Sequence, residues 1–266
     1  MSNLVNSKLA VCVAANPKYI YKYVDSFIKN LRTEGNYDGP LVVITNLFAS
    51  KFLFKIIFQN NDKNITFLKF KKTKFNKLTE SKLEDLETGS QPNRHITKRF
   101  QWEKLNLFDP KLKSWDYIFY LDINMTIHFD INPIFSELPV KKLFAKADRY
   151  PNYDKSLASQ FDQTKADFKI LNKEFDLSSK KYFQTGVLYF DTNLIEEKTK
   201  YNLIKLSERF PITLSNEQAI MNLYFANTLN CYEELPEQTD GFINYFYWKI
   251  ENKNIRITKQ NTIQNK

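Results

Sequence analysis

The stretch WDYIFYLDINMTIHFDI, Trp115 to Ile131, decides the fold of this chain. Its segment Tyr117 to Leu121 is apolar and aromatic, which is typical of a buried β-strand. That strand ends abruptly on Asp122, and Asn124 follows two residues later. A carboxylate at the end of a buried strand is unfavourable unless another group compensates its charge. Because ligands bind at this edge of the sheet in an α/β fold, we expect Asp122 to hold one.

Strand and helix patterns alternate along the rest of the chain. The predicted strands are 9–15, 41–45, 65–70, 142–147 and 182–190. The first predicted helix starts at Asn16 and Pro17 and buries a stripe formed by Tyr19, Tyr23, Phe27 and Leu31. The other predicted helices are 48–58, 94–108, 132–138, 164–175, 193–209 and 216–224. The polar segments 71–92 and 150–162 are predicted to be loops. The alternation predicts a single α/β domain with a mostly parallel central sheet flanked by helices.

The composition limits the partners of the protein. The formal charge is +9, but the basic residues are dispersed and no RNA-recognition or zinc-finger motif accompanies them, so we expect no nucleic-acid partner. A non-catalytic basic protein that binds nucleic acid or glycan remains an alternative. Cys12 lies in an apolar run and is expected to be a free thiol. The N-terminus lacks a signal pattern and no apolar run could span a membrane, which predicts a soluble, cytoplasmic protein.

Two groups of residues suit a phosphate-containing ligand. Asp122 and Asn124 offer hard oxygen atoms to a metal ion that bridges two phosphates, although both residue types also favour β-turns. The segment Ala14-Ala15-Asn16 would let a base or ribose lie against the backbone, and the helix start after it favours phosphate. A capped helix without a ligand explains that segment equally well.

Two further groups suit a sugar. Gly186, in Gln184-Thr185-Gly186, would let a sugar pack on a strand. Glu217 stands at a helix start and would serve as a general base or bind hydroxyl groups, or it would merely complement the helix dipole. His95 and His128 have no partners at metal-ligand spacing. The chain also lacks the motifs of P-loop NTPases, Rossmann dehydrogenases and serine hydrolases.

Five motifs in this order resemble the GT-A fold glycosyltransferases of family 8, which includes glycogenin and bacterial galactosyltransferases. They are VAANPKYI with Asn16 at the family's acidic position, Lys104-Leu105 for Arg-Leu, YLDIN for Tyr-Leu-Asp-x-Asp, FQTGV for Phe-Asn-x-Gly-Val, and NEQAIMN for the Asp-Gln helix. The chain is also similar to divergent glycosyltransferases of large DNA viruses, which implies the host cytoplasm.

The resemblance implies a single GT-A (Rossmann-like) domain, with a nucleotide-binding half at about 9–125 and a sugar- and acceptor-binding half at about 126–266. It implies transfer of a sugar from a nucleotide-diphosphate donor, a UDP-sugar, to a hydroxyl group of a glycan or protein acceptor. The implied roles are Mn²⁺ or Mg²⁺ ligation by Asp122 and Asn124, nucleotide binding by Ala14, Ala15, Asn16, Tyr19 and Lys104, and catalysis at the sugar by Asp148, Gln184 and Glu217.

Two departures from the family pattern concern the metal. Asn124 replaces the second metal-binding aspartate, and the family's C-terminal His-x-x-Gly-x-x-Lys-Pro-Trp segment is absent. Four basic residues of the tail are candidates to meet the diphosphate instead: Lys249, Lys253, Arg256 and Lys259. A sugar-phosphate nucleotidyltransferase of similar fold remains an alternative, although the Gly-rich phosphate loop of those enzymes is missing.

Overall fold

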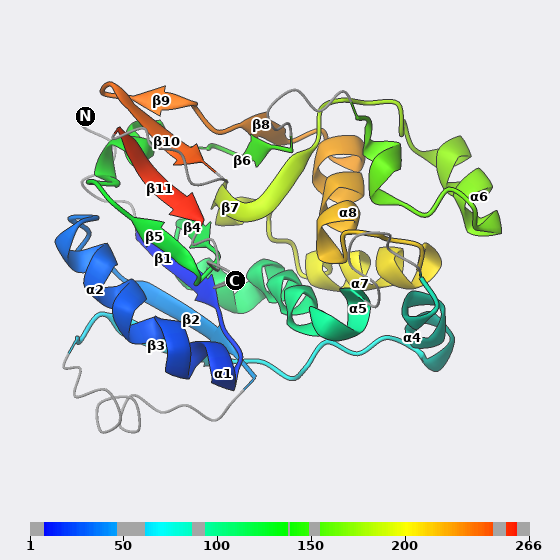
Figure 1. Ribbon diagram of the computed structural model, residues 1–266, viewed down its shortest axis with the longest axis horizontal. Coiled ribbons are helices and arrows are strands. Elements are labelled where there is room, and N and C mark those ends of the chain that lie inside the picture. Colours follow the sequence, from blue (N-terminus) through cyan, green and yellow to red (C-terminus); the bar gives the residue numbers. More distant parts are fainter. Residues whose placement is uncertain are drawn as a thin grey trace, which may run out of the picture.

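The computed structural model describes residues 8–46, 62–86, 94–137, 139–148, 155–246 and 254–259. Its strands are β1 (Leu9–Ala14), β2 (Leu41–Thr45), β3 (Ile65–Lys69), β4 (Tyr117–Leu121), β5 (Met125–Ile127), β6 (Leu143–Ala147), β7 (Phe183–Asp191), β8 (Tyr232–Glu234), β9 (Gln238–Thr239), β10 (Phe242–Phe246) and β11 (Ile255–Lys259). They form a seven-stranded sheet in the order β3-β2-β1-β4-β7-β6-β8 and a four-stranded sheet in the order β5-β11-β10-β9 (Figure 1).

Helices of three kinds connect the strands. The α-helices are α1 (Pro17–Tyr19), α2 (Asp25–Thr33), α4 (Lys77–Glu84), α5 (Arg94–Thr97), α6 (Ala166–Glu174), α7 (Thr199–Arg209) and α8 (Glu217–Met221). The π-helices are η1 (Ile20–Val24) and η7 (Asn222–Thr228), and the 3-10 helices are η2 (Arg99–Phe108), η3 (Pro110–Ser114), η4 (Asn132–Ser136), η5 (Leu157–Gln160) and η6 (Thr192–Leu194). The helix predicted at 48–58 lies outside the described residues.

The large sheet is mostly parallel, as predicted. Strands β1, β2, β3 and β4 pair in parallel, whereas β7 runs antiparallel to both β4 and β6. The carboxyl end of β4 therefore lies beside the first half of β7, where Leu121 pairs with Val187. The N–H of Asp122 donates to the carbonyl oxygen of Gly186 over 2.9 Å, so the sheet itself brings these two residues together.

Both faces of the large sheet are buried, because successive side chains of each strand enter different cores. In β4, Ile118 and Tyr120 enter one core, while Phe119 and Leu121 enter the other. The first core is shared with η2, α7 and α8, and the second with α2 and the small sheet (Figure 1). Asp122 follows Tyr120 by two residues and so continues the face that looks toward η2 and α8.

The first helix begins as predicted but buries different residues. The side-chain oxygen of Asn16 accepts from the N–H of Tyr19 over 2.8 Å, and Pro17 occupies the first turn. The next turn is the π-helix η1. The buried residues are Ile20, Val24, Phe27 and Leu31, at spacings of four, three and four that follow the ordinary helical period, whereas Tyr19 is 39% exposed. The predicted stripe was correct only for its second half.

Three other predictions need correction. Segment 71–92 contains α4, which the side chain of Asn76 caps by accepting from the N–H of Thr79 over 2.9 Å. The sequence obscures this helix because Leu83 is its only strongly apolar buried side chain. The segment 150–162, predicted to be a loop, contains the short helix η5 within its described part. The helix predicted at 94–108 divides into α5 and the 3-10 helix η2.

The pairing of β5 with a strand of the tail was not predicted, and it brings the tail of the chain to the edge where β4 ends. Strand β11 runs antiparallel to β5, and Lys259 pairs with Met125 in that register. Met125 closes a tight turn by donating its N–H to the carbonyl oxygen of Asp122 over 3.0 Å. Lys259 consequently lies next to the Asp122-Ile123-Asn124 turn.

Candidate active site

Asp122 lies between two lysines. Its Oδ1 accepts from the hydroxyl group of Tyr120 over 2.8 Å and lies 2.9 Å from Nζ of Lys104. Its Oδ2 lies 3.5 Å from Nζ of Lys259. The carboxylate that the sequence singled out is thus compensated by cations from η2 and from β11, which are distant in the sequence.

Lys104 is a buried lysine with a carboxylate on each side. It is 5% exposed, and its Nζ lies 3.2 Å from Oε1 of Glu217 as well as beside Asp122. It also donates to the carbonyl oxygen of Thr185 over 3.2 Å, and the Thr185 hydroxyl donates to Oε1 of Glu217 over 2.9 Å. A buried ammonium group is stable only when nearby carboxylates compensate its charge. Removing one member of such a buried pair leaves the other charge without a partner, and its desolvation then destabilises the folded protein.

Asp148 is held by neutral groups instead. The side-chain amides of Gln160 and Gln218 donate to its Oδ2 over 3.2 and 3.0 Å, and that of Gln184 donates to its Oδ1 over 3.1 Å. Gln218 in turn accepts from the N–H of Thr185 over 3.2 Å. Asp148 therefore belongs to the same connected network as Asp122.

The charges at this site stabilise one another. Burial raises the pKa of Asp122, but the ammonium groups of Lys104 and Lys259 outweigh that effect and hold the pKa below its ordinary value. Burial lowers the pKa of Lys104, and the carboxylates of Asp122 and Glu217 more than reverse the shift. Both groups are therefore ionised near neutral pH.

Lys98 adds a further positive charge at the rim. Burial and the nearby charges of Arg94 and Lys259 lower its pKa, while Asp122 and Glu217 act in the opposite sense. Lys98 itself is exposed. The site thus presents cationic groups toward solvent and holds its carboxylates deeper.

Glu217 and Gln184 each keep an acceptor oxygen available. Glu217 is 1% exposed, and within the described part of the chain its Oε2 has no hydrogen-bond partner; the same holds for Oε1 of Gln184. Asn216 directs Glu217 inward from a backbone with φ of 53°, and its side chain donates to Oε1 of Gln101 over 2.9 Å. Buried acceptors without a partner suit a ligand that brings hydrogen-bond donors.

The predicted nucleotide residues lie at the same edge of the sheet. Cys12 pairs with Tyr120, so Ala14 lies on the strand beside Asp122. Ala14 and Ala15 are buried, and Tyr19 stands exposed above them against the edge of Tyr23, with ring centroids 5.4 Å apart. Contact of these residues with a nucleotide stays a prediction.

The side chains at Asp122 do not fit a divalent metal ion. Mn²⁺ and Mg²⁺ require several oxygen ligands, and here both oxygen atoms of Asp122 already face ammonium groups. Asn124 is the one other donor that the sequence offered. In the described ranges no three His, Cys, Asp or Glu residues come together as a metal site. The expected metal at Asp122 and Asn124 therefore remains an untested prediction that this donor set does not favour.

Both histidines form hydrogen bonds with other residues of the protein. His95 accepts from the indole N–H of Trp102 over 3.0 Å and bonds Glu80 over 2.8 Å, and His128 bonds Thr258.

Of the four basic tail residues, Lys249 and Lys253 lie outside the described residues. Arg256 is buried and donates to the carbonyl oxygen atoms of Asp130 and Thr239, so only Lys259 of the described pair reaches Asp122.

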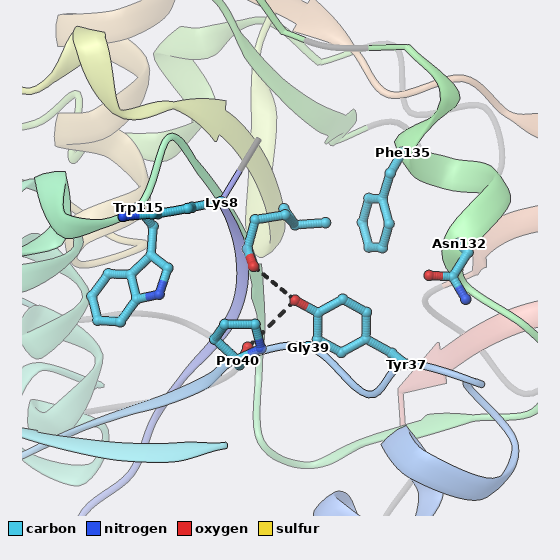
Figure 2. Close-up of a pocket in the computed structure, with 8 residues that line it drawn as sticks. Lys8, Tyr37, Gly39, Pro40, Trp115, Asn132 and Phe135 are labelled. Carbon is cyan, nitrogen blue, oxygen red and sulfur yellow. Dashed lines mark hydrogen bonds between the residues drawn. The ribbon is translucent and has the colours of Figure 1, made fainter. Parts of the chain in front are cut away.

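A cavity of about 630 Å³ lies at the opposite edge of the sheet, at the amino ends of β1, β2 and β4 (Figure 2). Trp115, Pro40 and Phe135 line it, and the hydroxyl group of Tyr37 donates to the carbonyl oxygen of Leu9 over 2.9 Å. None of the predicted catalytic, nucleotide-binding or metal-binding residues lines this cavity, so the Asp122 network is the better candidate for the predicted site.

Sequence reasoning missed three members of the site: Tyr120, Lys98 and Gln160. The signal for Tyr120 was present, because a residue two positions before Asp122 in a strand shares its face. No sequence pattern marks Lys98 or Gln160, since each reaches the site from a segment without a distinctive motif.

Solved structures share the fold of this chain, whereas no family model and no curated protein matches the sequence. The galactosyltransferase LgtC is 13% identical with a TM-score of 0.59, over 94% of this chain and 86% of that one. The mannosyltransferase Ktr4p from S. cerevisiae, in complex with GDP, is 11% identical with a TM-score of 0.57, over 86% and 69%. The glycosyltransferase GlyE of Streptococcus pneumoniae TIGR4 is 16% identical with a TM-score of 0.53, over 87% of this chain and 46% of that one.

This chain therefore spans less than half of the pneumococcal protein. At these identities the likeness shows the fold alone, and that fold is the GT-A glycosyltransferase fold. Among the described helices, none has the length and apolar character needed to cross a membrane.

Proposed function

We propose that this protein is a glycosyltransferase that moves a sugar from a nucleotide-diphosphate donor, a UDP-sugar, to a hydroxyl group of a glycan or protein acceptor. One observation carries the proposal. A single network joins Asp148, Glu217, Lys104, Asp122 and Lys259 at the carboxyl end of β4, with Lys104 buried between two carboxylates and Lys259 at the rim. The shared fold supports the same reaction class.

The chemical roles follow from what each side chain leaves available. Oε2 of Glu217 and Oε1 of Gln184 would accept hydrogen bonds from sugar hydroxyl groups, with Asp148 beside them. Ala14, Ala15, Asn16 and Tyr19 would hold the nucleoside on the neighbouring strand end. The cations would bind the diphosphate.

In the reaction, the bond between the anomeric carbon and the diphosphate oxygen breaks, and its electron pair remains on the phosphate. A new bond forms between that carbon and the acceptor oxygen, whose proton passes to the departing diphosphate. Fixed positive groups that face the leaving phosphate stabilise the negative charge as it develops there.

A thermal-shift panel tests this function. UDP-glucose, UDP-galactose and GDP-mannose are added with and without Mn²⁺, and a ligand at about 100 times its Kd stabilises the fold by about 2.7 kcal/mol. For a protein of this size that corresponds to about 5–10 °C in Tm. We expect at least one nucleotide sugar to give such a shift.

Adding a nucleoside triphosphate with a sugar 1-phosphate, and separately an oligonucleotide, to the panel tests the rival functions. A sugar-phosphate nucleotidyltransferase would be stabilised by a nucleoside triphosphate together with a sugar 1-phosphate. A basic binding protein would respond to an oligonucleotide, with a steep salt dependence, and not to nucleotide sugars. Either result without a nucleotide-sugar shift contradicts the proposed function.

A further inference from the structure

The two lysines at Asp122 differ in depth. The Lys104 side chain is 7% exposed and already lies between Asp122 and Glu217. The Lys259 side chain is 25% exposed, so its ammonium group borders both Oδ2 of Asp122 and the open side of the site. Lys259 is therefore a cation that an anionic ligand can reach.

The register of the small sheet fixes where Lys259 stands. Because β11 pairs with β5 through Lys259–Met125 and Thr258–Thr126, the lysine originates opposite the residue that follows Asn124. Strand register is strongly specified where one face is buried, and Ile257, which pairs with Ile127 in the same register, is 0% exposed. The lysine therefore belongs to the architecture of the site and does not reach it by chance from a long tail.

The arrangement of charge shows which group an anion would meet first. The carboxylates of Asp122 and Glu217 face Lys104 and Lys259, and Asp148 adds a third carboxylate to the network, so the site as a whole has no excess of positive charge. The Lys259 side chain is more exposed than that of Asp122, 25% against 16%. The diphosphate of a nucleotide sugar is ionised at both phosphates, so on the open side of the site Lys259 is the charge that complements it.

We propose that the ammonium group of Lys259 takes the place of the divalent cation and binds the donor's diphosphate directly. Asp122 is then a positioning residue that holds Lys259 and Lys104, and is not a metal ligand. Lysine binds phosphate as a compact point charge, which suits a site whose oxygen ligands are too few for a metal. The inference rests on the proposed function, because it concerns the diphosphate of the same donor.

Isothermal titration calorimetry with UDP, GDP, ADP and CDP tests this inference, in buffer with EDTA and in buffer with MnCl₂. We expect at least one nucleoside diphosphate to bind, with Kd values in the two buffers that agree within about threefold. Lys259→Met should weaken its binding about 10- to 100-fold, the usual effect of losing a charged hydrogen bond. Lys259→Arg should retain most of the affinity. Lys205→Met, which changes an exposed lysine on α7, serves as the matched control.

The outcomes separate the two proposals. If Mn²⁺ tightens binding tenfold or more, the metal-free site is wrong, while the proposed function stands. If binding is independent of metal but folded Lys259→Met binds as the wild type does, the role of Lys259 is wrong. If no nucleoside diphosphate binds in either buffer, the proposed function fails together with this inference. Circular dichroism of each variant verifies the fold.

Discussion

Replacing Lys104 by methionine removes a buried charge and keeps most of the volume of the side chain. Asp122 would retain the Tyr120 hydroxyl group and Lys259 as partners. Glu217, which is 1% exposed, would keep its hydrogen bond from the Thr185 hydroxyl group but would lose the ammonium group of Lys104. Leaving a buried charge without its partner costs about 3–5 kcal/mol. At about 2–4 °C per kcal/mol for a protein of this size, Tm should fall by about 6–20 °C.

A double-mutant cycle with Glu217→Gln tests the reason for this loss. The neutral amide no longer requires an ammonium group, so Lys104→Met should be less harmful in the Glu217→Gln background. We expect a coupling energy of about 1–3 kcal/mol from urea unfolding of the four proteins. The control Lys205→Met should melt close to the wild type. A loss below about 1 kcal/mol for Lys104→Met, or strictly additive effects, would refute the reasoning.

Three other changes have defined outcomes. Burial lowers the pKa of His95, and Glu80 reverses only part of this shift. The unfolded state therefore binds the proton more readily, so the free energy of unfolding should fall as the pH drops below about 6.5. Urea unfolding at pH 5.5 and 7.5 should show a smaller pH dependence for His95→Gln, and equal slopes would contradict this. Asn216 has φ of 53°, so Asn216→Ala should be less stable than Asn216→Gly by about 1–2 kcal/mol, and the reverse order would count against backbone strain. A Cβ at Gly186 would lie 2.9 Å from the flexible end of Met125 and 3.7 Å from Oδ2 of Asp122, so Gly186→Ala should fold but bind UDP more weakly. An unchanged affinity in calorimetry would exclude a close approach of the ligand to Gly186.

The large sheet was predictable because its strands carry continuous apolar runs. The parallel core and the strand before Asp122 required only periodicity and the sharp change from Leu121 to Asp122. The start of the first helix was assigned to the wrong face, because a constant spacing of four residues drifts away from the 3.6-residue period, and Ile20 and Val24 are buried in place of Tyr19 and Tyr23. Helix α4 was hidden because a surface helix with one buried leucine has no clear stripe.

The site was predictable as a set of residues but not as a set of contacts. Strand ends and helix starts marked Asp122, Asp148, Gln184 and Glu217, and the structure connects all four. The short strand β11 decides the role of Lys259, and a strand of that length in a polar tail has little sequence signal. Its pairing with β5 depends on long-range contacts that periodicity does not contain.

Donor hydrolysis tests the central claim most directly, because it requires the site to cleave a nucleotide sugar without any knowledge of the acceptor. Release of nucleoside diphosphate is followed for the sugar nucleotide that stabilises the fold, with the wild type, Asp122→Asn and Glu217→Gln. We expect turnover by the wild type and a decrease of at least about 100-fold in each folded variant, because Asp122→Asn releases the lysines that Asp122 positions and Glu217→Gln removes a charge beside the proposed sugar position. No release by the wild type, or equal release by all three proteins, would contradict the assignment of the Asp122 network as the active site.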